Sequence, residues 1–568
     1  MRGISIKAEY ENLWKGNWPP MLCFVVTFCW FGIFACMGVD IHHDGIMLKP
    51  ATDVANGQVL FRDTFTQYGA LTTFIQALAL KVFGPYLIVI RLTTVFFYSL
   101  SAVLLYYIWR NFLSPSFFWI AYGMFLVMPP FYGWIFNPWS SIYALFFMLL
   151  ANICMINFIR RGSVLWLWGA GVSSALTFWC RQPNGIVMYL ALFLFFAICL
   201  ALERKSWRRI LNNLGICTAA YVICSMCFLV YLGLNDALAD WYFQSIRFMF
   251  SFGFEDREAT SLFKCLFPGS VFIVFPIVTL SVLCVSLYSL VNRKSDAERP
   301  MVLMLIVTAI IGLASWHQYF PVPCFRHLYW ASIPMLGFYA FAIQWIVNFS
   351  IKVMPLHFSS YYGKLYFKFK GKMFTCLWQR LRRPGPVPHL YLPGLTKLLL
   401  IVILLLPFYS TITRMSRDMP AKLMSISESR VFYDSPLKYM LLRDSEYQLF
   451  KAFRSIMDRL PPEFANSRGI NFTNGAFFSL YFPNGNNFFP MYVNFGNSVY
   501  PDYTYQAGRV LAECRPIVIS HKKLEFPDYS LFAVIETHKS PIYFYLPSVR
   551  RQATDGEKEP IFNSEKKP

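Results

Sequence analysis

The sequence predicts an α-helical polytopic membrane protein that carries a C-terminal α/β or α+β domain. Three observations lead to this fold class. Hydrophobic residues make up 56% of the 568 residues and charged residues only 14%, whereas soluble globular chains carry about 25% charged residues. Apolar runs near the length of a membrane span recur along the chain, and they lack the alternation of outer-membrane barrel strands. After residue 413, turn-forming clusters and short apolar segments replace these runs.

The apolar runs predict about eleven transmembrane helices. A further apolar segment, 70–84, is too short to span a membrane and fits a helix that lies along the interface. The expected spans are 20–39, 86–109, 114–132, 138–159, 163–180, 185–202, 210–232, 269–291, 301–315, 328–350 and 397–413.

Basic residues are concentrated in every second loop, and this pattern predicts how the chain is oriented across the membrane. They gather in the N-terminal segment, in four short loops and in the segment 351–396, which the positive-inside rule places in the cytoplasm. That segment is also basic and aromatic enough to lie on anionic headgroups. The N-terminus is then cytoplasmic, and the outer loops 40–85 and 233–268 face the other side.

This topology divides the chain into three parts. Residues 1–413 form the membrane domain, residues 414–553 an extracytoplasmic soluble domain, and residues 554–568 a disordered tail. A helix near 444–460 and the apolar segments "RPIVIS", "LFAVIE" and "IYFYLP" are the expected elements of the soluble domain.

Composition excludes several function classes. The net charge of +21 would suggest nucleic acid in a soluble protein, but the topology explains the excess and no recognition module appears. The pair "CSMC" at 224–227 lies in an apolar run without a second pair, so it does not predict a zinc or redox site. Adjacent histidines rarely chelate one ion from a single stretch, so we expect no metal or other cofactor at His42-His43-Asp44, with a divalent metal as the alternative.

Titratable residues gather in the first outer loop, within "DIHHDGIMLKPATDVANGQVLFRDTFTQYG" (40–69). Asp44 opens a predicted helix that Asn56-Gly57 ends. Asp53 is expected at a solvated position of that helix, and Asp40 receives no role. Asp44 and Asp63 are the acids to which we assign functions.

Cations reach the same membrane face from two other places. Arg181 begins "RQPNG" at the outer end of the fifth predicted span, and the segment 315–334 supplies His317, Arg326 and His327. An arginine there can simply anchor the span in the headgroups, and Asp44 can simply cap a helix. However, anchoring does not require arginine on the face opposite the positive-inside bias.

Acidic residues in one loop and basic residues in two other segments are expected at the same membrane face. This combination suggests group transfer from a lipid-linked phosphate. A carboxylate near the membrane surface can take the proton of an acceptor hydroxyl. Arginine binds phosphate oxygens in bidentate fashion and stabilises the charge that develops on a phosphate leaving group.

The first outer loop resembles that of bacterial GT-C membrane glycosyltransferases. The order "HDG" (43–45), "NG" (56–57), "LFRDTF" (60–65) and "QYG" (67–69) is similar to the branch of the protein O-mannosyltransferases and aminoarabinose transferases. That branch carries two acids before the glycine, of which the second falls on Asp44 and the first on His43. "RHLYWASIP" (326–334) is similar to the family's stretch that enters a late span.

The resemblance implies transfer of a sugar from a polyprenyl-phosphate donor, with inversion, on the periplasmic face of a bacterial inner membrane. The implied acceptor is an envelope glycan, a lipid or a protein. In this interpretation Asp44 is the general base and Asp63 positions the base or the acceptor. Arg181, Arg326, His327 and His317 bind the donor phosphate.

Two other functions fit the same sequence. A transporter or flippase of a lipid-linked glycan would place ionisable residues at mid-membrane. A scaffold or sensor would act through its outer domain alone and would not need Asp44.

Overall fold

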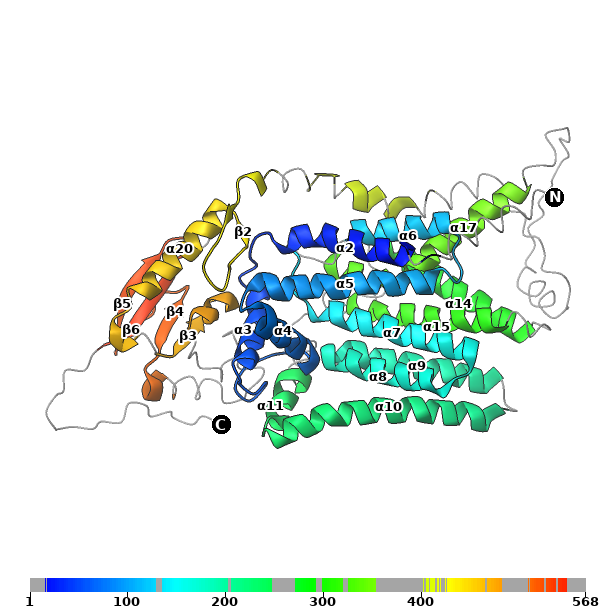
Figure 1. Cartoon of the computed structure of the whole chain (residues 1–568), viewed down its shortest axis with the longest axis horizontal. Coiled ribbons are helices and arrows are strands. Elements are labelled where there is room, and N and C mark those ends of the chain that lie inside the picture. The colour runs from blue at the N-terminus through cyan, green and yellow to red at the C-terminus, as the bar shows by residue number, and fades with distance from the viewer. Residues whose placement is uncertain are drawn as a thin grey trace, which may run out of the picture.

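The structure, a computed structural model, describes most of the chain. It covers residues 16, 18–128, 135–202, 206–247, 271–292, 299–319 and 325–353, parts of 402–427 and, with short gaps, 428–482 and 509–548. A bundle of long helices makes up one part of the molecule, and a small domain with a sheet lies at one end of it (Figure 1).

Ten helical segments lie where the sequence predicts the first ten spans. Eight of the helical stretches in the described residues are long and apolar enough to cross a membrane, and two shorter apolar helices, α6 and α8, accompany them. The chain is a multi-pass membrane protein. Most of the eleventh predicted span, 397–413, lies outside the described residues. The helices are α2 (Trp18–Ala35), α5 (Leu87–Trp109), α6 (Pro115–Val127), α7 (Ser140–Arg161), α8 (Val164–Cys180), α9 (Gln182–Leu202), α10 (Trp207–Leu234), α14 (Val274–Asn292), α15 (Arg299–Ser315) and α16 (Phe325–Ser332), continued after a short 3-10 turn by α17 (Leu336–Val353).

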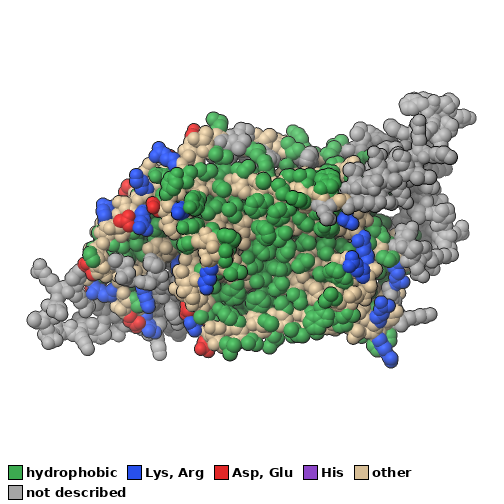
Figure 2. All heavy atoms as spheres, viewed as in Figure 1, with side chains coloured by type: hydrophobic (Ala, Val, Ile, Leu, Met, Phe, Trp, Pro, Cys, Tyr) green, Lys and Arg blue, Asp and Glu red, His purple; other side chains and the backbone are tan. Residues whose placement is uncertain are grey.

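The bundle presents a broad apolar surface. Figure 2 shows a band of hydrophobic side chains over the helices, with Lys and Arg at the end away from the C-terminal domain and both basic and acidic side chains at the other end. Leu165, Val230 and Val285 are among the exposed apolar residues. Arg160 and Arg161 lie in the last turn of α7, and Arg110 follows α5 directly. Such a band bounded by charges is the surface that a lipid bilayer requires.

The first outer loop folds into two helices that pack on each other at the same end of the bundle as the C-terminal domain (Figure 1). They are α3 (His43–Ala55) and α4 (Ala70–Phe83), and Gly57, at φ +93°, follows α3 as predicted. The prediction for Asp53 was wrong. Its side chain is buried, accepts hydrogen bonds from Lys49 Nζ at 2.5 Å and Thr64 Oγ1 at 2.7 Å, and so stabilises the turn after α3.

The second outer loop is described only as far as residue 247. It begins with α11 (Leu238–Trp241) and the π-helix η2 (Tyr242–Arg247). The Trp241 ring stacks on Trp179 with 5.5 Å between centroids. The Gln244 side chain donates to the Phe61 carbonyl at 2.7 Å and accepts from the Thr66 amide at 3.1 Å, which joins the two outer loops.

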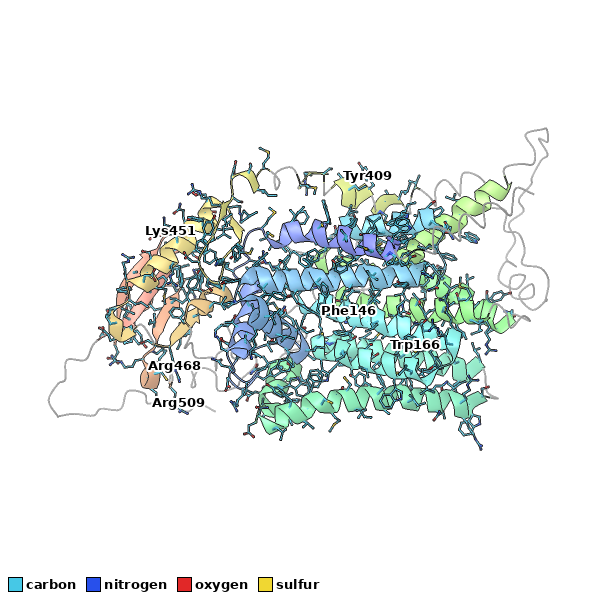
Figure 3. All side chains as sticks on the ribbon, in the orientation of Figure 1. Phe146, Trp166, Tyr409, Lys451, Arg468 and Arg509 are labelled. Atoms are coloured by element: carbon cyan, nitrogen blue, oxygen red, sulfur yellow. The ribbon has the colours of Figure 1, made fainter. Side chains whose placement is uncertain are left out.

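The C-terminal domain is an α+β unit, as predicted. One helix covers a four-stranded sheet in the order β3-β4-β6-β5, in which β3 and β4 are parallel and the other neighbours antiparallel. Aromatic side chains form its core, for instance Phe453 against Phe544 at 5.0 Å. Figure 3 places Lys451 and Arg468 in this domain and Phe146 and Trp166 in the bundle. The elements are β1 (Arg430–Val431), β2 (Leu441–Leu442), α20 (Asp444–Asp458), β3 (Gly469–Phe472), the 3-10 helix η8 (Ala476–Tyr481), β4 (Ile517–Ser520), β5 (Tyr529–Ile535) and β6 (Ile542–Pro547). The predicted tail, 554–568, lies outside the described residues.

Backbone hydrogen bonds fasten this domain to the end of the bundle that carries the first outer loop. Leu441 donates to Cys36 and accepts from Gly38, both at 2.8 Å. Phe477 donates to the carbonyl of Ile41 at 2.8 Å. At Gly45, a Cβ atom would stand 2.1 Å from the Phe477 nitrogen, so only glycine permits this approach of η8 to α3. The C-terminal domain therefore fixes the backbone before and after Asp40.

Candidate functional site

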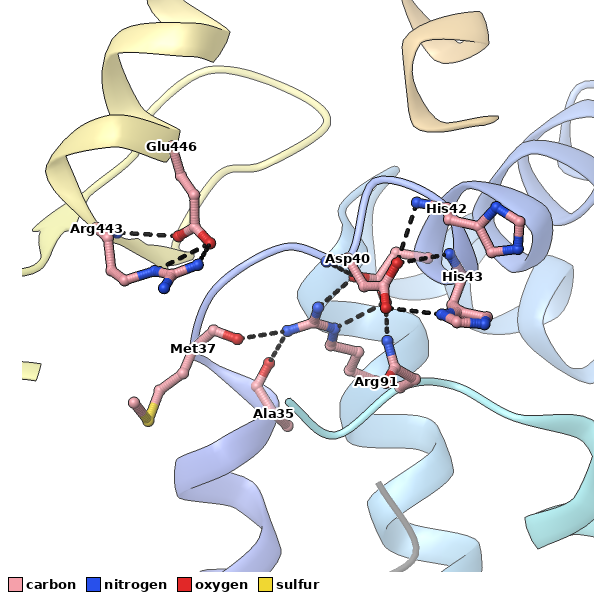
Figure 4. Close-up of polar contacts among 10 residues, drawn as sticks. Ala35, Met37, Asp40, His42, His43, Arg91, Arg443 and Glu446 are labelled. Atoms are coloured by element: carbon pink, nitrogen blue, oxygen red, sulfur yellow. Dashed lines mark hydrogen bonds and ion pairs between the residues drawn. The ribbon is translucent and has the colours of Figure 1, made fainter. Parts of the chain in front are cut away.

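Asp40, for which no role was predicted, organises the start of α3. Its Oδ1 accepts from the amides of His42 at 3.1 Å and His43 at 2.9 Å, and its Oδ2 contacts His43 Nδ1 at 2.7 Å (Figure 4). Burial acts to raise the pKa of Asp40, but the hydrogen bonds and charge of His43, together with the His42 amide, outweigh it and lower the pKa to about 2. Asp40 is therefore an ionised partner that orients the His43 ring.

Asp44, the predicted base, lies in a buried ion pair. Both of its oxygens face the guanidinium of Arg91, and the side chain of each residue is fully buried. The Asp40 amide at 2.8 Å and Asn137 Nδ2 at 3.3 Å also donate to Asp44. Burial raises the pKa of Asp44, and the charge of Arg91 opposes that rise. Since a guanidinium stays charged, the bidentate geometry fits an ionised carboxylate.

Arg91 extends this network to the end of α2. Its Nη1 donates to the carbonyls of Ala35 and Met37, both at 3.0 Å (Figure 4). The Asp44–Arg91 pair thus connects α2, α3 and α5. A role as base would require Asp44 to leave these partners, so its geometry favours a structural contribution, and the predicted catalytic role is untested.

Asp63, the second predicted acid, lies at the surface. Arg62 donates to its two oxygens at 2.9 and 3.0 Å, and the Val59 amide donates at 2.8 Å. The hydrogen bonds from Arg62 lower the pKa of Asp63. Arg62 also donates to the carbonyl of Asn235 at 3.2 Å, so the Arg62–Asp63 pair links the two outer loops.

Trp139 is the centre on which the other candidate residues converge. Its ring lies 4.8 Å from His43, 6.0 Å from Tyr68 and 5.8 Å from Trp330, centroid to centroid. Trp139 was not among the predicted site residues because the apolar run 138–159 predicts a membrane span. The polar "NPWSS" (137–141) at the start of that run was the available signal.

Two of the predicted cations reach this centre through aromatic rings. The Arg181 guanidinium lies 5.9 Å from the Tyr68 ring and donates to Ser141 Oγ at 2.7 Å. His327 stacks on Trp330 with 5.1 Å between centroids. His43 therefore contacts Trp139 directly, whereas Arg181 and His327 are each connected to it through one intervening ring, that of Tyr68 or Trp330.

The other two predicted cations lie on neighbouring segments. His317 contacts the Ala314 carbonyl through Nδ1 at 2.7 Å and Asn184 Oδ1 through Nε2 at 3.2 Å, which joins "RQPNG" to the segment after α15. Arg326 belongs to α16, one residue before His327, but its side chain lies outside the described residues.

Buried polar atoms without a hydrogen-bond partner lie on the same segments. In the described part of the chain they include Ser140 Oγ, Gln182 Nε2 and Gln318 Oε1, each in a residue no more than 5% exposed. Leaving such a group unsatisfied costs about 1–3 kcal/mol. These atoms adjoin Trp139, Arg181 and His317 in the chain, which suits a region that receives a polar ligand.

A cavity of about 1310 Å³ opens between the first outer loop and the C-terminal domain. The segment Val39–His42 forms one side, α20 another, and the end of β5 with Glu536 and Thr537 a third. Asp40 and His42 are thus cavity residues, whereas Asp44 is not. Among the described residues, no group of three or more His, Cys, Asp or Glu side chains is placed to hold a metal ion.

Comparisons with known proteins agree with the family resemblance. Residues 69–254 match the family model described as dolichyl-phosphate-mannose-protein mannosyltransferase. This match agrees with the resemblance to the protein O-mannosyltransferases that the first outer loop indicates. A search of curated proteins finds no match.

Two solved structures are similar in outline. The crystal structure of ArnT from Cupriavidus metallidurans bound to undecaprenyl phosphate has 12% identity and a TM-score of 0.49, over 94% of this chain and 99% of that one. The apo structure of the same protein gives 12% identity and a TM-score of 0.48, over 92% and 97%.

Proposed function

We propose, starting from the mannosyltransferase family match over residues 69–254, that this protein is a membrane glycosyltransferase. Its donor is a polyprenyl-phosphate sugar, and its acceptor carries a hydroxyl group and belongs to the cell envelope. The reaction occurs at the end of the bundle that carries α3, α4 and the C-terminal domain. The observation that carries the proposal is the aromatic cluster of Trp139, Tyr68 and Trp330, whose rings contact His43, Arg181 and His327 respectively.

The general base in this proposal is the Asp40–His43 pair. A carboxylate that accepts the Nδ1 proton fixes the ring orientation and leaves Nε2 as the basic nitrogen. This arrangement also gives a role to the histidine at position 43, where the family resemblance implies an acid. Asp44 and Arg91 hold the segment in place and act as positioning residues, and Asp63 positions the two outer loops.

The donor phosphate binds on the other side of Trp139. Arg181 supplies a charge-assisted donor, His327 and Arg326 lie on α16, and the unpartnered Gln182 and Ser140 offer further polar groups. His317 orients the segment between α15 and α16 through Asn184.

The transfer step balances as one substitution. His43 takes the proton of the acceptor hydroxyl while the acceptor oxygen forms a bond to the anomeric carbon. The bond from that carbon to the phosphate oxygen breaks, and its electron pair leaves with the lipid phosphate. The cations near Trp139 stabilise the charge that the phosphate gains. Attack opposite the leaving group inverts the anomeric centre.

The distribution of charge within the spans favours an enzyme over a transporter. In the described spans, Arg91 and Arg326 lie away from the basic helix ends. Arg91 sits in the second turn of α5, paired with Asp44, and Arg326 lies near the start of α16. A transporter would instead be expected to carry ionisable groups at mid-membrane.

Transfer from labelled donors tests the proposal. Membranes containing the protein are supplied with a panel of polyprenyl-phosphate sugars, and label is counted in lipid, polysaccharide and protein fractions. Incorporation from one donor is expected in one fraction. Label that crosses the membrane without incorporation in any fraction would instead support a transporter.

Variants separate the base from the donor site. Asp40→Asn and His43→Ala should lower kcat by about 10²–10⁴ with little change in the donor KM, and His43→Glu should recover part of that loss because it restores a carboxylate. Arg181→Gln should mainly raise the donor KM. Full activity of His43→Ala, with Asp44→Asn inactive but folded, would return the base assignment to Asp44.

A further inference from the structure

We infer that the cavity between the first outer loop and the C-terminal domain binds the acceptor, and that it selects an uncharged or amine-bearing glycan over an anionic one. The assignment of the ligand as acceptor rests on the proposed function. The selectivity for charge rests on the cavity itself.

The position of the cavity connects it to the base. Its floor is the segment Val39–His42, which includes the carboxylate that contacts His43. Backbone hydrogen bonds from Leu441 and Phe477 hold this segment on both sides of Asp40. A hydroxyl group on a ligand at the floor would therefore lie beside the Asp40–His43 pair.

The size of the cavity suits an extended ligand. Its volume of about 1310 Å³ exceeds the roughly 300–1,000 Å³ that is usual for pockets that hold small molecules. It opens between two structural units, so a chain of sugars can enter without being enclosed.

The lining combines the two kinds of surface that a sugar ring presents. Short polar side chains can exchange hydrogen bonds with hydroxyl groups, and apolar side chains between them can contact the C–H faces. The polar lining residues include Ser445, Gln448, Ser455, Thr537, Ser540 and His521, and the apolar ones include Leu449, Ala452, Ile456 and Phe478.

The charges of the lining determine which glycan fits. Four acidic residues line the cavity, namely Asp40, Asp444, Glu446 and Glu536, against one arginine, Arg459. Three of these acids form ion pairs, but with His43, Arg430 and Arg443, which are not lining residues. A phosphate or carboxylate on the ligand would face repulsion here, whereas hydroxyl and ammonium groups would donate to the carboxylates.

Binding of three oligosaccharides of equal length tests the inference without donor or turnover. The full-length protein in nanodiscs is titrated with a glucosamine hexamer, its N-acetylated neutral counterpart and a galacturonic acid hexamer. We expect saturable binding of the first two and at least about tenfold weaker binding of the third, since tenfold corresponds to about 1.4 kcal/mol. Preferred binding of the galacturonic acid hexamer, or no saturable binding of any of the three, overturns the inference.

Two substitutions localise the binding to the cavity. Ser455→Trp on α20 should fill the space and weaken binding by about tenfold, whereas Arg454→Trp, at an exposed position of α20 outside the cavity lining, should leave it unchanged. Unfolding temperatures establish that both variants fold. Glu536→Lys, at an exposed edge of the cavity, should narrow the difference between the neutral and the acidic hexamer. Equal binding by wild type and Ser455→Trp overturns the assignment.

The two proposals fail in different ways. Loss of hexamer binding in Ser455→Trp with no transfer from any donor would refute the glycosyltransferase while leaving a glycan site in place. Transfer that is unaffected by Ser455→Trp would leave the enzyme in place and refute the cavity as its acceptor site.

Discussion

Asp44 and Arg91 illustrate at the residue scale why a carboxylate in a conspicuous sequence position need not be reactive. The pair is fully buried, and each member would be an uncompensated charge without the other. Removing one partner of a buried ion pair costs about 3–5 kcal/mol, although replacing both is often nearly neutral. The sequence showed the acid but not its partner, because Arg91 lies in another helix.

Substitution of this pair should therefore affect stability more than chemistry. We expect Asp44→Asn and Arg91→Gln each to lower the free energy of unfolding by about 3–5 kcal/mol, measured by thermal unfolding in detergent. The double variant should lose less than the sum of the two single losses. Asp63→Asn is the matched control, since Asp63 lies at the surface and its pair with Arg62 is worth little. Strict additivity would contradict a direct pair.

The element scale shows which structures a local pattern determines. Runs of about 20 apolar residues predicted the first ten spans because the thickness of the membrane sets their length. The segment 70–84, predicted to be a short helix along the interface, forms the helix α4, and Gly57 follows α3 as predicted. The role of Asp53 was not predictable, since its burial depends on Lys49 and Thr64, the latter beyond the end of the helix.

The site was predictable in part for the same reason. The sequence identifies Arg181 and His327 by their predicted place at the ends of spans, and in the structure both contact rings that lie against Trp139. Trp139 itself and the Asp40–His43 pair depend on packing between segments, and the sequence does not state which segments meet. His317 and Arg326 lie on the segments that lead into α16, close in sequence to His327. Their predicted contacts with the donor phosphate stay predictions.

The start of α3 should respond to acid because Asp40 holds it. The pKa of Asp40 is lowered to about 2 in the folded protein from the usual 3.8. The stabilisation is therefore complete above the unfolded value and is lost as the pH falls through about 2. Between pH 5 and pH 2 we expect a larger fall in unfolding temperature for wild type than for Asp40→Asn. Parallel curves for the two proteins would exclude Asp40 as a stabilising charge.

At the scale of the whole molecule, the C-terminal domain and the membrane bundle act as one body at the candidate site. Segment 36–41 bonds to β2 and to the start of η8, and the Leu87 amide at the start of α5 bonds to the Pro436 carbonyl at 2.9 Å. The cavity exists only because the two parts meet. The domain therefore does more than shield the site: it fixes the backbone on both sides of Asp40.

Gly45 offers the most direct test of this coupling. A methyl group there would lie within 2.1 Å of the Phe477 backbone, which cannot move without displacing η8 from α3. We expect Gly45→Ala to loosen the junction, with faster hydrogen exchange at segment 36–45 and at η8 but unchanged exchange in α7 and α8. Gly32→Ala is the control, since nothing lies within 4 Å of a Cβ at that position of α2.

Since the junction also positions Asp40 and His43, the Gly45→Ala substitution should lower the kcat of sugar transfer and leave the KM for the donor nearly unchanged. Unchanged exchange at both segments, in a folded Gly45→Ala protein, would show that the domain is not needed to hold the first outer loop.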